Sequence, residues 1–192
     1  MELFSGQNAA MLLVDHQAGA FEQQLRHADE VRRNVVALAL AAAVLDLPVV
    51  VTTDAEQYRG ELLPQLASVL PDAAASRIRR NGLVDAFADP HVDAAVSATG
   101  RRNLIVAGAG ADVCATLASI HAVHAGYVVQ AVADASAATT ALAHDLALRR
   151  MERAGVTLTT TGQIVAELAV DFSTAAGVQL AQVLGQLRRP GD

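Results

Sequence analysis

The chain has 192 residues, a single cysteine and a formal net charge of −6; 53% of its residues are hydrophobic and only 3% are aromatic. This length fits one domain, which we place at residues 1–187, followed by a C-terminal tail at 188–192. The acidic balance argues against a nucleic-acid partner, and no apolar run reaches the roughly 20 residues that span a bilayer. One cysteine excludes an internal disulfide and fits a reducing cytoplasm.

Strand-like and helix-like segments alternate along the chain. The expected strands are short apolar runs, at residues 9–15, 49–53, 103–107, 127–132 and 156–160. The expected helices lie between them, at about 30–45, 61–70, 90–100, 114–126, 140–154, 163–168 and 175–187. Asp29 is expected to cap the first helix, and residues 71–88 read as a long loop that contains Arg79 and Arg80.

Three of these helices end in a glycine directly before a strand-like run, at Gly100, Gly126 and Gly155. Glycine suits the left-handed position that turns a helix back toward a sheet. Alternating units of this kind predict right-handed crossovers and a parallel, doubly wound sheet. Active sites in such sheets form beyond the carboxyl ends of the strands.

Three polar features fall at such strand ends: Asp15, the segment 108–114 (GAGADVC), and Asp134. A carboxylate at the end of an apolar strand is costly unless it is paired. Asp15 could therefore belong to a site, or could cap a neighbouring loop.

Cys114 is expected in the first turn of a helix, where the dipole and exposed N–H groups favour an anion. We therefore predict a lowered thiol pKa, especially if an arginine is close. The competing interpretation is an inert, buried cysteine. Arg79 and Arg80 are either part of this site or solvated surface residues.

The glycines at 108 and 110 match the start of a dinucleotide-binding loop, but Val113 stands where a third glycine belongs. We therefore predict no cofactor. Glycine here also lets backbone N–H groups approach a substrate oxyanion. His121 and His124 share a helix face, but two histidines without partners do not make a metal site.

Five segments in order resemble the isochorismatase-like cysteine hydrolases, most closely their YcaC-like branch. The similarity covers about residues 9 to 170. The segments that carry it are MLLVDHQAG (11–19), LPVVVTT (47–53), NGLVDAFADP (81–90), LIVAGAGADVCATLA (104–118) and AGYVVQAVADASAA (125–138).

This resemblance implies a three-layer α/β/α sandwich with a mainly parallel sheet. It also implies a triad of Asp, Lys and Cys, in which Asp15 matches the aspartate and Cys114 the nucleophile. The lysine position falls at Arg80, a departure from the wider family, with Arg79 as the alternative. An arginine there can supply charge but cannot exchange a proton.

The resemblance further implies a cis peptide bond between Ala109 and Gly110. That bend would direct the N–H groups of Gly110 and Cys114 into an oxyanion hole. Ala109 and Gly110, together with Gln17 and Phe87, form the expected substrate-binding set. The nicotinamidase-type relatives hold zinc with Asp-x-His after the second strand, where this chain has Asp-Ala-Glu at 54–56. We therefore predict no metal.

The expected function is cleavage of a small amide, a related C–N bond or an ester through an acyl-enzyme on Cys114, with Asp15 as acid and base. We expect a small-molecule substrate and a cytoplasmic homo-oligomer of two, four or eight copies, with no nucleic-acid or membrane partner. The alternatives are a thiol redox or peroxide-responsive protein, and a catalytically silent ligand-binding member. Cleavage of a vinyl ether, as by an isochorismatase proper, also stays open.

Overall fold

The computed structural model describes residues 3–23 and 25–187, so the predicted tail at 188–192 lies outside them. Six parallel strands form one sheet in the order β3-β2-β1-β4-β5-β6. The strands are β1 (Ala9–Val14), β2 (Val49–Asp54), β3 (Ile78–Arg80), β4 (Asn103–Gly108), β5 (Val128–Val132) and β6 (Thr157–Thr159). The predicted parallel sheet is confirmed.

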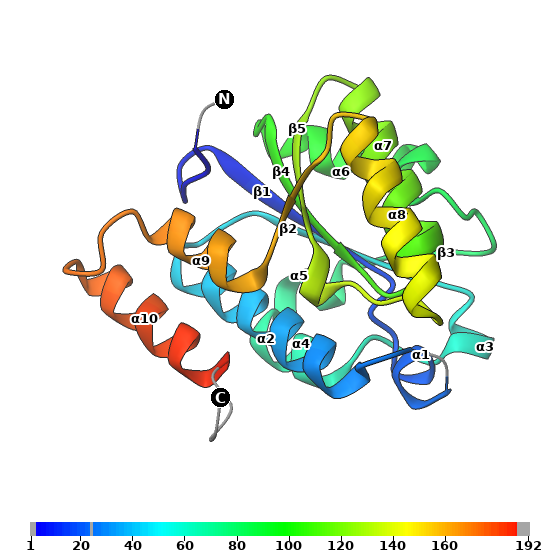
Figure 1. Cartoon of the computed structure of the whole chain (residues 1–192), viewed down its shortest axis with the longest axis horizontal. Coiled ribbons are helices and arrows are strands. Elements are labelled where there is room, and N and C mark those ends of the chain that lie inside the picture. Colours follow the sequence, from blue (N-terminus) through cyan, green and yellow to red (C-terminus); the bar gives the residue numbers. More distant parts are fainter. Residues whose placement is uncertain (1–2, 24, 188–192) are drawn as a thin grey trace.

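Helices cover both faces of this sheet, as Figure 1 shows. One layer contains α2 (Ala28–Val44), α4 (Pro64–Val69), α9 (Thr161–Ala169) and α10 (Ala175–Leu187). The other contains α6 (Pro90–Ala98), α7 (Thr116–His124) and α8 (Ala141–Arg153). The predicted three-layer sandwich is therefore confirmed. No helix in the described part of the chain is both long and apolar enough to cross a membrane.

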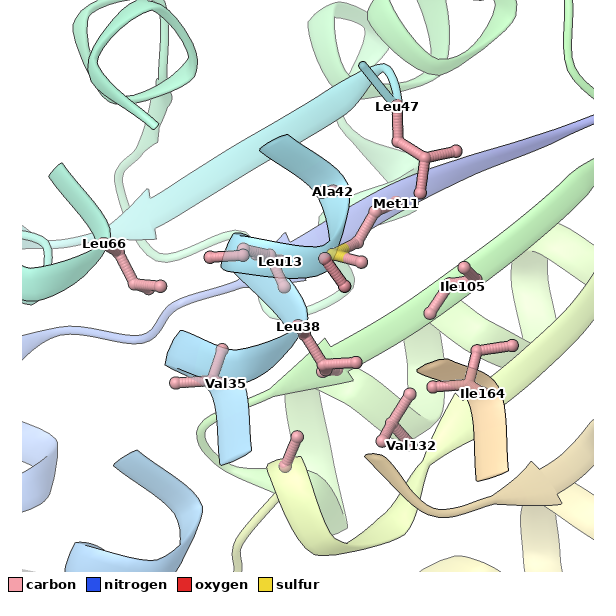
Figure 2. Packing of buried hydrophobic residues seen from close by; sticks show 14 of the residues in the cluster. Met11, Leu13, Val35, Leu38, Ala42, Leu47, Leu66, Ile105, Val132 and Ile164 are labelled. Atoms are coloured by element: carbon pink, nitrogen blue, oxygen red, sulfur yellow. The ribbon is translucent and has the colours of Figure 1, made fainter. Parts of the chain in front are cut away.

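The core lies in two clusters, one on each face of the sheet. Alternate residues of β1 serve both, because successive side chains of a strand point to opposite faces. Met11 and Leu13 pack with Leu38 of α2 and Ile164 of α9 (Figure 2). Leu12 instead packs in the cluster of the α6–α8 layer. All six residues of β1 are buried, as expected of a central parallel strand covered on both faces.

The segment 71–88 differs most from its prediction as a loop. It contains α5 (Pro71–Ala75), β3 and a 3-10 turn at Ala86–Ala88. β3 has only three residues, two of them arginines, so it carries no apolar run. Its strand conformation comes from parallel pairing with β2, in which Asp54 lies opposite Arg80.

Several helix boundaries also differ from the predictions. α2 begins at Ala28 behind a left-handed His27, so Asp29 lies in the first turn and not at the cap. There its charge is still favourable to the helix dipole. The predicted helix at 61–70 is shorter and starts at Pro64, which suits the first position of a helix. Two short helices, α1 (Ala18–Gln23) and α3 (Glu56–Arg59), were not predicted.

Candidate active site

Asp15 and Arg80 form a buried ion pair at the carboxyl edge of the sheet. Asp15 follows β1 in a left-handed conformation (φ 56°), and Arg80 ends β3. One Arg80 Nη donates to Asp15 Oδ2, and Thr52 Oγ1 donates to Asp15 Oδ1 at 2.8 Å. The two charged side chains are 0% and 1% exposed. A buried ion pair is stable only when its mutual attraction and its hydrogen bonds compensate for the loss of hydration.

Arg80, and not Arg79, is the arginine that meets Asp15. The other Nη of Arg80 donates to the Leu83 carbonyl. Burial alone would lower the pKa of the Arg80 guanidinium, but the Asp15 carboxylate raises it overall. Arg79 points to solvent, and its Nε donates to Glu56 Oε2 at 3.2 Å.

Cys114 lies in a π-helical turn (Ala111–Ala115) that leads into α7, and its residue surface is 4% exposed. Gly110 precedes this turn in a left-handed conformation, with φ 83° and ψ 50°. The described residues contain no cis peptide bond, so the predicted cis bond between Ala109 and Gly110 is wrong. Gly110 makes the bend instead, because glycine adopts positive φ without steric cost.

The loop that follows β5 holds this turn in place. The amides of Gly110 and Ala111 both donate to the Ala137 carbonyl, at 2.9 and 2.7 Å. The predicted use of the Gly110 amide in an oxyanion hole is therefore wrong, because a carbonyl already occupies that donor. Within the described residues, the Cys114 amide makes no backbone hydrogen bond outside its own helical turn. It remains the candidate donor to a substrate oxygen.

The Cys114 thiol is less acidic than predicted. Burial raises its pKa, and the nearby Asp15 carboxylate raises it further, to about 11 from an ordinary 9.0. Arg80 and Arg59 act in the opposite direction but do not prevail. The predicted lowering of this pKa is wrong, because desolvation and a carboxylate outweigh the helix terminus and the arginines. At neutral pH the resting residue is a thiol.

No pattern in the sequence assigns a role to His16, yet this residue is fully buried beside Asp15. Its Nε2 lies 3.1 Å from the Ala135 carbonyl, and its ring stacks on Phe21 at 6.2 Å between centroids. Nδ1 has no hydrogen-bond partner among the residues that the structure describes. Burial lowers the pKa of His16 to about 4, so the ring is neutral at pH 7 and links β1 to the loop after β5.

Gln17 braces the backbone instead of facing a ligand. Its Nε2 donates to the carbonyls of Asp54 (3.0 Å) and Gly60 (2.6 Å), and its Oε1 accepts the Asp54 amide at 2.8 Å. Both of its N–H donors are thus used within the protein. The predicted role of Gln17 in binding substrate is replaced by one in fixing α3, through Asp54 before this helix and Gly60 after it.

The other two predicted substrate-binding residues are both buried. Phe87 is 2% exposed, packs in the same core cluster as Cys114, and meets the Tyr127 ring edge-on at 5.6 Å. Ala109 is also 2% exposed and forms an isolated parallel bridge with Ala137. Phe87 can therefore shape the apolar wall behind the sulfur, while Ala109 supports the nucleophile turn.

The carboxylates at the end of β2 and directly after it are engaged by protein groups. Asp54 accepts the Gly82 amide at 2.6 Å and lies 3.7 Å from Arg59 Nε. Glu56 accepts Arg77 Nε at 2.8 Å as well as Arg79. Burial would raise the pKa of Glu56, but the bonds from these arginines lower it overall.

No three His, Cys, Asp or Glu side chains gather around a possible metal position in the described ranges. His121 instead lies 2.8 Å from Asp85 through Nδ1, and His124 is exposed. A separate cavity of about 370 Å³ opens beside the loop after β5, between the starts of α2 and α8. Asp15, Arg80 and Cys114 do not line it.

Comparison with known proteins gives concordant matches. The family model for the isochorismatase domain matches residues 9–163. The curated protein "Probable hydrolase YcaC" of Escherichia coli (strain K12) is 35% identical over 167 residues, which are 86% of this chain and 79% of that protein.

Two solved structures are similar over nearly the whole chain. The YcaC gene product from Escherichia coli, described as an octameric hydrolase of unknown specificity, has a TM-score of 0.91 and 34% identity, covering 97% of this chain and 91% of its own. YcaC from Pseudomonas aeruginosa, with hexane-2,5-diol and covalent acrylamide, has a TM-score of 0.89 and 34% identity, covering 96% and 91%.

Proposed function

This chain belongs to the isochorismatase family and is YcaC-like, and from that premise we propose that it hydrolyses a small amide, a related C–N bond or an ester through an acyl-enzyme on Cys114. The observation that carries the proposal is the Asp15–Arg80 ion pair beside a buried, neutral thiol. A carboxylate paired with a cation next to a protonated nucleophile is an arrangement that suits general-base catalysis.

In the first half-reaction, Asp15 accepts the thiol proton while the Cys114 sulfur attacks the substrate carbonyl. The C–S bond forms, and the carbonyl electron pair moves onto oxygen, where the Cys114 amide donates to it. The electron pair then returns, the bond to the leaving group breaks, and Asp15 passes its proton to the departing amine or alcohol. Asp15 is ionised again at the end of this step.

Water completes the cycle. Asp15 takes a proton from the water as its oxygen attacks the thioester carbonyl, the C–S bond breaks, and the proton returns to the sulfur. Arg80 does not exchange protons, because a guanidinium stays charged. Its role is to pair with the buried Asp15 carboxylate and to offset the negative charge that develops on the sulfur.

One further observation supports a nucleophilic cysteine. YcaC from Pseudomonas aeruginosa carries covalent acrylamide, an electrophile that reacts with thiolates. The raised thiol pKa of this chain also argues against a peroxide sensor, which relies on a thiolate at rest. The same raised pKa is the observation that favours the second candidate function, a ligand-binding member that performs no chemistry.

We also propose a homo-oligomer that works in the cytoplasm, where a thiol stays reduced. An Escherichia coli relative is octameric. This chain exposes large apolar side chains on α8, with Leu142 at 68% and Leu146 at 54%. Such side chains on one helix suit a surface that another copy covers.

The deciding experiment compares wild type with Cys114→Ala on a panel of small amides, carbamoyl compounds and esters. Intact-mass spectrometry after rapid quenching should show an acyl adduct on the wild type, and Cys114→Ala should show neither adduct nor turnover. Arg79→Gln, an exposed change close to the site, serves as the matched control and should keep both. Hydrolysis at an unchanged rate by Cys114→Ala would contradict the proposed mechanism.

A further inference from the structure

Arg59 is a half-exposed cation at the same edge of the sheet as the proposed catalytic residues. It ends α3, the short helix that follows β2, and its side chain is 50% exposed. Its ion-pair partner among the described residues is Asp54, 3.7 Å from Nε, which is too far for a hydrogen bond. The Asp54 carboxylate is itself held by the Gly82 amide at 2.6 Å.

The other arginines of this edge are neutralised at closer range. Arg80 is paired with Asp15 and also donates to a carbonyl. Arg77 and Arg79 share the Glu56 carboxylate, at 2.8 and 3.2 Å. Arg59 is therefore the cation of this group whose charge is least compensated by the protein, and half of its side chain faces solvent.

The backbone beneath Arg59 is tightly fixed. A Cβ atom on Gly19 would lie only 2.6 Å from the Arg59 carbonyl oxygen, so α1 and α3 approach closely, as Figure 1 also shows. Gln17 Nε2 donates to the Gly60 carbonyl, and the Ala18 amide donates to Glu61. The segment directly after Asp15 thus holds the base of the Arg59 side chain.

The charge of Arg59 also reaches the nucleophile. It is one of the two arginines that lower the pKa of the Cys114 thiol, although burial and Asp15 outweigh them. Charges act over about 8 to 10 Å before salt screens them. Asp54, the ion-pair partner of Arg59, also lies opposite Arg80 in the pairing of β2 with β3, so the same carboxylate residue connects Arg59 to the buried pair.

We propose that Arg59 determines substrate specificity by binding a carboxylate on the acyl portion of the substrate. The inference rests on the proposed function, since it names the substrate class for that same site: amides or esters whose acyl group carries a negative charge. A guanidinium suits this task because it presents a fork of N–H donors that matches a carboxylate. Arg80, which is fully engaged, is left to serve the chemistry.

The first test needs no substrate, because Cys114 is the single cysteine of the chain. Its alkylation rate is measured with iodoacetate, which is an anion, and with iodoacetamide, which is a neutral analogue of similar size. Arg59→Gln should lower the iodoacetate-to-iodoacetamide ratio roughly three- to fivefold, the range of an exposed ion pair. Arg59→Lys should retain most of the ratio, and 0.5 M salt should reduce the difference.

Arg79→Gln is the matched control, because Arg79 is an arginine of similar exposure (55%) whose charge faces Glu56. Its ratio should equal that of wild type. An equal slowing of both reagents by Arg59→Gln, or no change in either rate, would overturn the inference. Taking a ratio cancels changes in thiol acidity and in general access to the sulfur, so a small loosening of the fold would not imitate the effect.

A second readout uses p-nitrophenyl hemisuccinate and p-nitrophenyl acetate. Arg59→Gln should raise KM for the anionic ester alone and leave kcat unchanged, because the contact forms before the chemical step. A changed kcat with both esters would overturn the specificity role. If wild type hydrolyses neither of these esters nor any amide, carbamoyl compound or ester of the panel, but the alkylation ratio falls in Arg59→Gln, the anion site is supported and the proposed hydrolysis is not.

Discussion

Buried titratable groups on the two sides of β1 differ in whether they carry a charge. Toward β2 and β3, Asp15 and Arg80 are both charged and fully enclosed. Toward β4 and β5, His16 and Cys114 are also buried, but each is held in its neutral form, with pKa values of about 4 and about 11. These four groups lie at one edge of the same sheet.

The partner of each group accounts for the difference. Burial makes every charge costly, and Asp15 and Arg80 meet this cost with each other. His16 meets a carbonyl and an apolar ring, and burial lowers its pKa by more than the adjacent Asp15 carboxylate raises it. Cys114 faces the same carboxylate, which disfavours its thiolate. Burial therefore sets the cost of a charge, and the nearest group decides whether the charge is kept.

The largest expected effect comes from breaking the charged side. Arg80→Met leaves the Asp15 carboxylate buried without a countercharge, and should lower the free energy of unfolding by about 3–5 kcal/mol. Urea unfolding monitored by circular dichroism measures this. The double variant Asp15→Asn with Arg80→Met should recover most of the loss, because no unpaired charge remains.

Arg79→Met is the control for this prediction, since it removes the exposed arginine next to Arg80. It should cost less than about 1 kcal/mol. If the Arg80 and Arg79 variants lose equal stability, the buried pair does not have the energetic role assigned to it.

On the neutral side, acid is expected to lower the stability of the fold through His16. Its pKa is about 4 in the folded chain and about 6.5 when unfolded, so between these values the unfolded chain binds the additional proton. The stability linked to His16 is present above pH 6.5 and is lost as the pH falls toward 4, by about 3 kcal/mol. Urea midpoints between pH 7 and 4 should fall more for wild type than for His16→Gln. Parallel curves for the two proteins would contradict this assignment.

Cys114 gives the smallest expected effect, at the other end of the pH scale. Its pKa is raised from 9.0 to about 11 on folding, so the unfolded chain releases the proton first. Stability should therefore fall between about pH 9 and 11, by on the order of 2 kcal/mol. The measurement is the difference between wild type and Cys114→Ala, which lacks the group. A constant difference across this range would mean that the thiol pKa is not raised.

The strands and their order along the chain could be predicted because each apolar run is short and bounded by polar or turn residues. β3 could not, because its two arginines are placed by pairing with β2 and not by any local preference. The same reasoning explains α3, a single turn whose position depends on bonds from Gln17.

In the candidate site, too, residues with a local signal in the sequence could be predicted, and residues placed by distant contacts could not. Asp15 and Cys114 were identified from their places at strand ends, and Arg80 from the resemblance to a family. The thiol pKa was predicted in the wrong direction, because the sequence shows the helix start but not how deeply the sulfur is buried beside Asp15. His16 and Thr52 were missed, because their partners lie 119 and 37 residues away in the chain.

The left-handed turn at Asp15 has a practical meaning for protein engineering. Three consecutive side chains leave it toward three different places: Asp15 to Thr52 and Arg80, His16 to the loop after β5, and Gln17 to the backbone on both sides of α3. Adding or deleting one residue here would shift all three anchors together. A library that aims at new substrates should leave this triplet intact and vary the exposed rim, where Leu83 and Val84 lie.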